Sequence, residues 1–208
     1  MNSKEYETVD NPSVNESKKD KHRLFVAVPL PDELKLAIGE WSRKLRAAQP
    51  FRKWTETADL HVTLQFLGDT EPERIEALKS ALAASAGRIQ PFRLTLEGAG
   101  VFGRSEQPRV LWAGIGGEPE SLRLLQRAVV EATAPLGFQA EARPYSPHLT
   151  IARSYAGSAS FSLPELLGDG DSAGSDPQPA WRADEIVLYR THMHRRPMYE
   201  AAARFALG

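Results

Sequence analysis

The sequence predicts an α+β fold, and three features of its 208 residues favour that class. Strand-like and helix-like hydrophobic patterns alternate along the chain. Several neighbouring strand-like segments are joined by connections of hairpin length, which parallel strands cannot use. The pattern His-x-Thr occurs in two hydrophobic, strand-like runs, at residues 61–63 and 148–150, and this repetition hints at two similar halves.

Each expected element has a local signal. An apolar run from Leu24 to Val28 stops at two prolines, as a buried strand does. Asp32 can cap a helix whose apolar residues recur with a spacing near 3.6 and which closes before Pro50. The further elements expected in chain order are a His-x-Thr strand ending at 68–69, a helix starting near 72, strands over 92–102 and 109–115, a helix from 119 that ends near 137, a His-x-Thr strand over 147–153, and strands over 185–191 and 198–207.

Two segments are expected to lack regular structure. Residues 1–21 are polar, with mixed charge and almost no aliphatic side chains, so they cannot bury enough surface to offset the entropy of ordering. We expect a disordered tail there, followed by a single domain over residues 22–208. The stretch 157–181 is rich in Gly, Ser, Asp and Pro, which predicts a long surface loop with one short turn of helix.

Composition narrows the class of protein. The formal net charge is −1, so no global basic field indicates a polyanionic partner, although a local basic cleft is compatible with this value. The chain has no cysteine, which excludes disulfides and thiolate metal sites. No apolar run approaches the length of a membrane span, and the N-terminus lacks the apolar core of a signal peptide. We therefore expect a cytoplasmic protein.

The side-chain period of a strand predicts where the motif residues point. Because successive side chains point to opposite faces, His61, Thr63 and Gln65 are expected to share one face. The opposite, buried face is expected to carry Val62, Leu64 and Phe66. The second motif repeats the arrangement with His148 and Thr150. If the two strands are neighbours, two imidazoles and two hydroxyls converge.

Such a set of groups suits phosphodiester cleavage. Two histidines can act as a complementary acid and base, because imidazole titrates near neutral pH. Two threonine hydroxyls can donate hydrogen bonds to the non-bridging oxygens of a phosphodiester, so that no metal is needed. A 2',3'-cyclic phosphate is a natural substrate, since it needs only in-line attack by water and protonation of one ribose oxygen.

Two other interpretations of the histidines remain open at this point. A histidine in a strand is often a half-buried residue with one partner and no catalytic role. Histidine is also the commonest metal ligand, and His192 with His194 adds a His-x-His pair. That pair precedes Arg195-Arg196-Pro197, which predicts an exposed hairpin turn, and no helical HExxH pattern or cluster of carboxylates accompanies it.

Five longer stretches carry a resemblance to a known family. They are RLFVAVPLPDEL from Arg23, LHVTLQFLGDT from Leu60, GVFGRSEQPRVLWAGI from Gly100, RPYSPHLTIAR from Arg143 and EIVLYRTHM from Glu185. In these stretches, which span residues 23–193, the chain resembles the 2H phosphoesterase superfamily. It is more closely similar to the RNA 2',3'-cyclic phosphodiesterase group, also called 2'-5' RNA ligase-like.

The resemblance implies a fold and an activity. The fold is bilobal, with two antiparallel β-sheets flanked by helices, pseudo-two-fold symmetry and a central cleft that carries the two motifs. The activity is hydrolysis of 2',3'-cyclic phosphate to a 2'-phosphomonoester, without metal or other cofactor. By motif position, His61 is the acid for the 3'-oxygen and His148 the base for water, while Thr63 and Thr150 bind the phosphate.

Residues near the second motif are further candidates. Arg153 falls where the family has a basic residue, and is expected to bind phosphate. Strict alternation would put it on the face opposite His148, so a twist or bend must turn it toward the cleft, and a surface ion pair is the alternative. Tyr145 is the candidate for stacking on a base. Ser146 stands where the family often has a larger polar residue.

Other candidates lie farther from the motifs. Phe25 and Tyr189 are aromatic, and Phe25 is expected to pack in the core. Arg104 and Arg109 flank a loop that could reach RNA phosphates. Gln65 is expected at the rim of the cleft, where the family often has a basic residue, and this departure affects the expected affinity for RNA rather than the chemistry.

The expected partners are RNA ends or nucleotides with a 2',3'-cyclic phosphate, and the protein is expected to be a monomer without membrane contact. Alternative substrates are 2',5'-linked oligonucleotides and ADP-ribose cyclic phosphate. A non-catalytic protein of the same fold that binds RNA ends is the alternative from another functional class.

Overall fold

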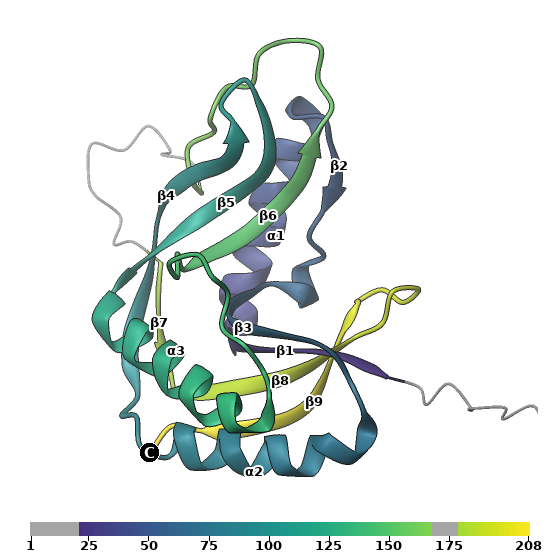
Figure 1. The fold of residues 1–208 in the computed structure, drawn as a ribbon. Helices are drawn as coiled ribbons and strands as arrows, with labels where there is room; N and C mark the ends of the chain where they lie inside the picture. Colours follow the sequence, from purple (N-terminus) through teal and green to yellow (C-terminus); the bar gives the residue numbers. More distant parts are fainter. Residues whose placement is uncertain (1–20, 168–178) are drawn as a thin grey trace, which may run out of the picture.

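The computed structural model describes residues 21–167 and 179–208 (Figure 1). The tail expected over 1–21 lies almost wholly outside these ranges, as does the acidic part of the expected loop. The elements are β1 (His22–Pro29), α1 (Asp32–Ala48), β2 (Phe51–Trp54), η1 (Thr57–Asp59), β3 (His61–Thr70), η2 (Pro72–Arg74), α2 (Ile75–Ala86), β4 (Phe92–Arg104), β5 (Gln107–Gly117), α3 (Pro119–Thr133), η3 (Ala134–Leu136), β6 (His148–Tyr155), β7 (Ala180–Ala183), β8 (Glu185–Thr191) and β9 (Tyr199–Ala206).

The strands form two antiparallel groups that meet at the motif strands. Across the sheet the order is β7-β4-β5-β6-β3-β1-β8-β9. β2 lies outside this order and pairs with the end of β6, on the edge away from β5. Neighbours within each group share several residue pairs, but β3 and β6 share only the pair Val62 with Leu149. Beyond this pair the strands separate into an upper and a lower lobe in Figure 1. The predicted α+β class with two lobes is confirmed, but in place of two separate sheets the described strands form one curled nine-stranded sheet, because β3 and β6 share one residue pair.

The helices lie outside the strands, as predicted. Helices α2 and α3 pack against each other along the lower lobe, with α2 beside β9 and α3 beside β3 (Figure 1). The side chains of Leu78 and Leu82 on α2 are fully buried. Helix α1 runs along the upper lobe, where the Trp41 indole donates to the carbonyl of Glu165 in the segment after β6. Pro72 begins a 3₁₀ turn that leads into α2.

Two short strands correct the expected element order. β2 pairs with β6, and β7 pairs with the start of β4, so residues 180 and 181, the end of the expected loop, belong to a strand instead. Each has four residues, too few for alternation to stand out in a sequence. Trp181 of β7 is 5% exposed, and this burial holds the strand in place. In the described part of the loop, 157–167, the expected turn of helix is absent.

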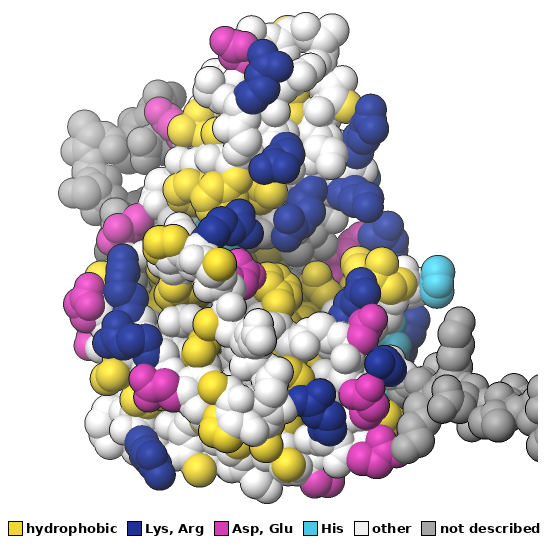
Figure 2. Space-filling view, viewed as in Figure 1, with side chains coloured by type: hydrophobic (Ala, Val, Ile, Leu, Met, Phe, Trp, Pro, Cys, Tyr) yellow, Lys and Arg dark blue, Asp and Glu magenta, His cyan; other side chains and the backbone are white. Residues whose placement is uncertain are grey.

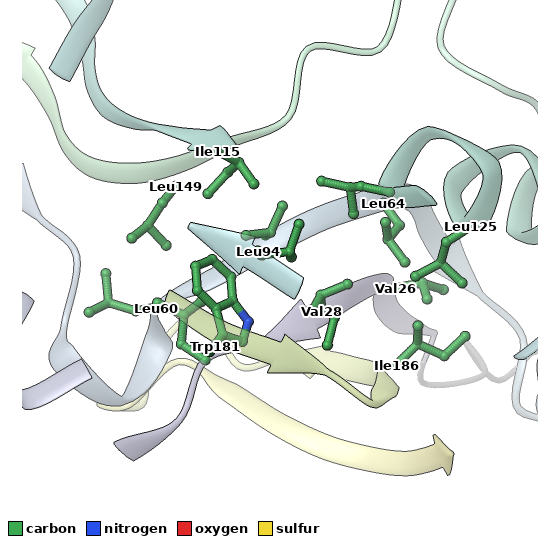
Figure 3. Packing of buried hydrophobic residues seen from close by; sticks show 14 of the residues in the cluster. Val26, Val28, Leu60, Leu64, Leu94, Ile115, Leu125, Leu149, Trp181 and Ile186 are labelled. Atoms are coloured by element: carbon green, nitrogen blue, oxygen red, sulfur yellow. The ribbon is translucent and has the colours of Figure 1, made fainter. Parts of the chain in front are cut away.

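One hydrophobic core serves both lobes. Figure 3 shows Leu64 of β3 and Leu149 of β6 among side chains from both groups of strands, with the Trp181 indole near Leu94. The motif strands therefore have a packed apolar back, which holds their polar face rigid. A shared core agrees with a single domain, and the domain bounds at residue 22 stay a prediction.

Candidate active site

The two His-x-Thr motifs face each other where β3 and β6 share one residue pair. Val62 pairs with Leu149 in the antiparallel register, and both side chains are fully buried. One residue further in each direction, this register sets His61 opposite Thr150 and Thr63 opposite His148. The side chains of these four residues are on the face opposite the buried pair, so the expected convergence of two imidazoles and two hydroxyls is present.

The two imidazoles are oriented by the same kind of hydrogen bond to the backbone. The Nδ1 atom of His61 lies 2.7 Å from the carbonyl oxygen of Asp59, and that of His148 lies 2.8 Å from the carbonyl oxygen of Ser146. Because a carbonyl only accepts, each Nδ1 carries the proton and each Nε2 is the nitrogen that exchanges protons. The His61 Nε2 lies 3.1 Å from the Thr63 hydroxyl. Ser146 thus contributes through its backbone.

A β-bulge in β3 overturns the expected positions of Gln65 and Phe66. Ala27 pairs with Thr63, but its neighbour Val26 pairs with Gln65, so β3 has one extra residue here and Gln65 turns to the face opposite Thr63. Gln65 is 5% exposed, and its Oε1 accepts a 2.8 Å hydrogen bond from the Thr133 hydroxyl. Phe66, expected in the core, is 55% exposed. Both predictions were wrong because strict alternation was assumed.

A bulge at the matching position of β6 brings Arg153 into the cleft. Trp112 pairs with Thr150 and Leu111 with Ala152, so β6 also has an extra residue after its threonine. Arg153 then pairs with Val110, which shares a face of β5 with Trp112. The Arg153 Nη2 donates to the Thr150 hydroxyl over 3.4 Å. This bulge is the bend that we expected to turn Arg153 toward the cleft.

His61 lies among aromatic rings. Its ring centroid is 4.7 Å from that of Phe25 and 5.2 Å from that of Tyr199, and Tyr189 stacks on Phe25 at 5.1 Å. Phe25, Ala27, Val187 and Tyr189 form a small buried cluster of their own, apart from the main core. The pKa of His61 is lowered to about 4, chiefly by burial there and in smaller part by the nearby charges of Arg153 and His148, while the hydrogen bond to Asp59 opposes the shift.

His148 has a more open position. The Phe102 ring meets it edge-on, with centroids 4.9 Å apart. Burial is the largest cause that lowers the pKa of His148, Arg153 adds to this effect, and the hydrogen bond to Ser146 opposes it. Arg153 therefore acts on the titration of both histidines, which fits its position beside both motifs. Phe102 was not singled out in the sequence, since an aromatic residue in a strand gives no signal of its own.

Asp59 is a residue whose role the sequence did not reveal. It is 4% exposed, and its carboxylate accepts hydrogen bonds from the backbone N–H groups of Met198 and Tyr199 over 2.9 and 3.0 Å. Its carbonyl holds the His61 ring. Asp59 thus joins the start of β9, including the Tyr199 ring that packs on His61, to the first motif. This link depends on residues about 140 positions apart, so no local pattern could predict it.

The remaining candidates have other surroundings. The Tyr145 hydroxyl donates to the Thr63 carbonyl over 2.9 Å, its ring packs against the main core, and burial raises its pKa. Its role in base stacking stays a prediction. Tyr189 is 8% exposed and packs in the small cluster. Arg104 is exposed and forms an ion pair with Glu106 at the end of the β4–β5 hairpin, and Arg109 is exposed.

The histidines outside the motifs are apart from the cleft. His192 and His194 lie in the turn between β8 and β9, as expected, and the His192 imidazole pairs with Glu200. Within the ranges 21–167 and 179–208, no three His, Cys, Asp or Glu side chains gather closely enough to hold a metal ion. None of the helices described here combines the length and the apolar composition that a bilayer crossing requires.

The fold and the paired motifs can now be compared with known proteins. A family model described as the 2'-5' RNA ligase superfamily matches residues 30–195. The chain belongs to this superfamily. The match covers both motifs and the strands between them, and it confirms the resemblance found in the sequence.

Relatives in this superfamily are similar over most of the chain. A Geobacillus stearothermophilus protein named RNA 2',3'-cyclic phosphodiesterase is 43% identical over 90% of this chain, which spans only 58% of that relative's length. A Bacillus subtilis protein of the same name is 32% identical over 88% of this chain and 96% of its own. The crystal structure of Escherichia coli LigT complexed with 3'-AMP superposes with a TM-score of 0.69 at 30% identity, over 90% of this chain and 98% of LigT.

Proposed function

We propose that this protein hydrolyses 2',3'-cyclic phosphate at RNA ends or on nucleotides to a 2'-phosphomonoester. The observation that carries the proposal is the register that sets each motif histidine opposite the other motif's threonine, with both Nε2 atoms available. Relatives named RNA 2',3'-cyclic phosphodiesterase, and a LigT structure with bound 3'-AMP, support the choice of substrate.

The reaction can be written for the two histidines. One imidazole takes a proton from water as the water oxygen forms a bond to phosphorus. The bond between phosphorus and the 3'-oxygen breaks, and the second imidazole gives that oxygen a proton, leaving a 3'-hydroxyl and a 2'-phosphate. By the family resemblance, His148 is the base and His61 the acid. General acid-base catalysis contributes about 10² to 10⁴-fold for a positioned group.

The threonines and Arg153 would hold the phosphate during this reaction. Thr63 and Thr150 present hydroxyls beside the two imidazoles, and the Arg153 guanidinium is already hydrogen-bonded to Thr150. As water attacks, negative charge grows on the non-bridging oxygens. A guanidinium and two hydroxyls fixed on rigid strands can stabilise that charge without reorganising.

The protonation states set a condition on these roles. With a pKa of about 4, His61 is neutral at pH 7 in the empty cleft, whereas an acid must carry its proton. A bound phosphate adds a negative charge next to the imidazole, which favours the protonated form. Our assignment therefore requires that the substrate itself raise the pKa of His61.

The test is hydrolysis of a nucleoside 2',3'-cyclic phosphate by purified protein in the presence of EDTA. We expect turnover to the 2'-phosphate, identified by phosphorus NMR, that does not depend on added metal. Turnover only with added metal would contradict the mechanism. The proposed substrate would be wrong if the protein did not hydrolyse this compound but cleaved a 2',5'-linked dinucleotide or ADP-ribose cyclic phosphate. The compound that is cleaved would then be the substrate. Binding of RNA ends without any turnover would point to the non-catalytic alternative.

The proposal extends to a cytoplasmic monomer. All residues that we assign to the reaction come from one chain, and both motifs lie where the two lobes of that chain meet (Figure 1). Size-exclusion chromatography with light scattering would test the monomer.

A further inference from the structure

The two walls of the cleft differ in how their positive charges are balanced. On the lower lobe, four arginines have carboxylate partners: Arg23 pairs with Asp69, Arg195 with Glu200, Arg196 with Glu56 and Arg204 with Glu185. On the upper lobe, Lys53 and Arg153 are exposed, and neither has a carboxylate within ion-pair distance among the described residues. Two exposed cations without an ion-pair partner therefore lie next to each other on the upper lobe.

The surface view agrees with this difference. In Figure 2, Lys and Arg side chains gather at the middle of the molecule, over the upper lobe, above a hollow lined partly by hydrophobic side chains. Lower on the same face, dark blue and magenta side chains lie next to one another.

Lys53 is the next cation beyond Arg153. In the β2–β6 register Lys53 pairs with Arg153, and directly opposite residues of antiparallel strands point to the same face. The strands are about 4.8 Å apart. Since Arg153 contacts Thr150, the donors Thr150, Arg153 and Lys53 form a line that leads from the second motif to the outermost strand of this lobe.

The structure of the proposed substrate indicates which group could bind along this line of donors. A 2',3'-cyclic phosphate ends an RNA chain at its 3' side, so every other phosphate of the molecule lies on the 5' side of the terminal nucleotide. Beside His61 the lower wall carries the side chains of Phe25, Tyr189 and Tyr199, none of which is cationic. The remaining direction for the backbone is along the upper wall.

The geometry points to a second phosphate-binding site at Lys53, which takes the phosphodiester on the 5' side of the terminal nucleotide. Arg153 binds the reacting phosphate and Lys53 the one before it. The favoured substrate is then an oligonucleotide with a cyclic phosphate end rather than a mononucleotide. This inference rests on the proposed function, because it assumes that the reacting phosphate lies between the two motifs.

The experiment compares two substrates in four proteins. The substrates are a mononucleoside 2',3'-cyclic phosphate and a trinucleotide with the same terminal nucleotide and cyclic phosphate. The proteins are the natural one, Lys53→Ala, Lys53→Arg and the control Lys79→Ala. Lys79 is a basic residue of α2, paired with Glu76 and outside the cleft, so its removal changes the net charge equally. The quantity compared is the ratio of kcat/KM for the trinucleotide to kcat/KM for the mononucleotide.

We expect a ratio above one for the natural protein, a ratio about fivefold lower for Lys53→Ala, and ratios near the natural value for Lys53→Arg and Lys79→Ala. For the trinucleotide, the slope of log(kcat/KM) against log salt should become shallower by about 0.7 in Lys53→Ala, the value for one lost phosphate contact in a single strand.

An unchanged ratio in Lys53→Ala overturns the inference while leaving the proposed function intact, because both substrates are still hydrolysed. An equal fall in Lys79→Ala also overturns it, since general charge would then explain the effect. If the natural protein hydrolyses neither substrate, the proposed function fails, and the inference fails with it.

Discussion

The motif strands β3 and β6 are alike in their His-x-Thr residues and differ in the residues that follow each motif. Each has His-x-Thr, an imidazole Nδ1 bonded to the carbonyl two residues earlier, and a bulge after the threonine. The bulge turns the third residue after each threonine toward the cleft. In β3 that residue is Phe66, and in β6 it is Arg153.

This difference suggests how a nearly symmetric pair of strands can act on an asymmetric substrate. The symmetric part brings two equivalent imidazoles to one place. The asymmetric part places Phe66 beyond one motif and Arg153 beyond the other, and we infer that this difference orients the nucleotide. The two histidines also differ in their surroundings, because His61 contacts the rings of Phe25, Tyr189 and Tyr199, whereas His148 meets the edge of the Phe102 ring.

Removal of either imidazole should have the largest effect on activity. We expect His61→Ala and His148→Ala each to lower kcat by about 10³-fold on a nucleoside 2',3'-cyclic phosphate, since each loses a proton-transfer group. His192→Ala, in the β8–β9 turn, is the matched control and should stay within about twofold of the natural rate. A large loss in only one motif variant would mean that the strands are not equivalent partners.

Exchange of the cleft residues beyond the bulges should have the next largest effect. Arg153→Met removes a charged donor to the phosphate and should lower kcat/KM by about 10 to 100-fold. It should also raise the pKa of both motif histidines, because the Arg153 charge lowers both. Phe66→Leu should change kcat/KM by only a few fold. NMR titration of the two imidazoles checks the pKa shifts, and unchanged values would place Arg153 away from the motifs.

Asp59→Asn should disturb one motif and leave the other intact. An asparagine cannot accept from both the Met198 and Tyr199 N–H groups as a carboxylate does, so Tyr199 should pack less tightly on His61. Because burial is the largest cause of the low His61 pKa, water reaching the ring should raise that pKa from about 4 toward its ordinary value. We expect kcat to fall about tenfold with little change in KM. An equal pKa shift at His148 would indicate general loosening of the fold instead.

Gln65→Lys should affect stability rather than RNA binding. The bulge buries Gln65 against Thr133, so a lysine there would bring an unpaired charge into the core and destabilise the fold by about 2 kcal/mol or more. Urea denaturation measures this cost. Tighter RNA binding with unchanged stability would mean that residue 65 faces the cleft, as strict alternation had suggested.

The sequence predicted most of the elements and the chemical groups, and its errors have a common cause. Hydrophobic periodicity is enough to recognise long segments such as α1 and α3, and the hydrophobic runs around both motifs can be recognised in the same way. A bulge changes neither composition nor hydrophobicity, so it cannot be recognised from the pattern that it interrupts. It nevertheless reversed the positions of Gln65 and Phe66 and supplied the turn that Arg153 needed.

The other misses depend on tertiary contacts. The β2 and β7 strands are too short to show a period, and each is held by pairing with a distant strand. Asp59 and Lys53 look like ordinary charged residues in the sequence. Only the pairing of Asp59 with the β9 backbone and of Lys53 with Arg153 gives them a place in the site.

The most direct test of two imidazoles acting as acid and base on one phosphate uses a leaving group that needs no acid. The substrate is a cyclic phosphate in which sulfur replaces the 3'-bridging oxygen, because a thiolate leaves without protonation. We predict that His61→Ala hydrolyses this substrate at a rate close to that of the natural protein, while His148→Ala stays inactive on it. If His61→Ala remained inactive on the sulfur substrate, as His148→Ala is expected to, the assignment of His61 as the acid would be contradicted.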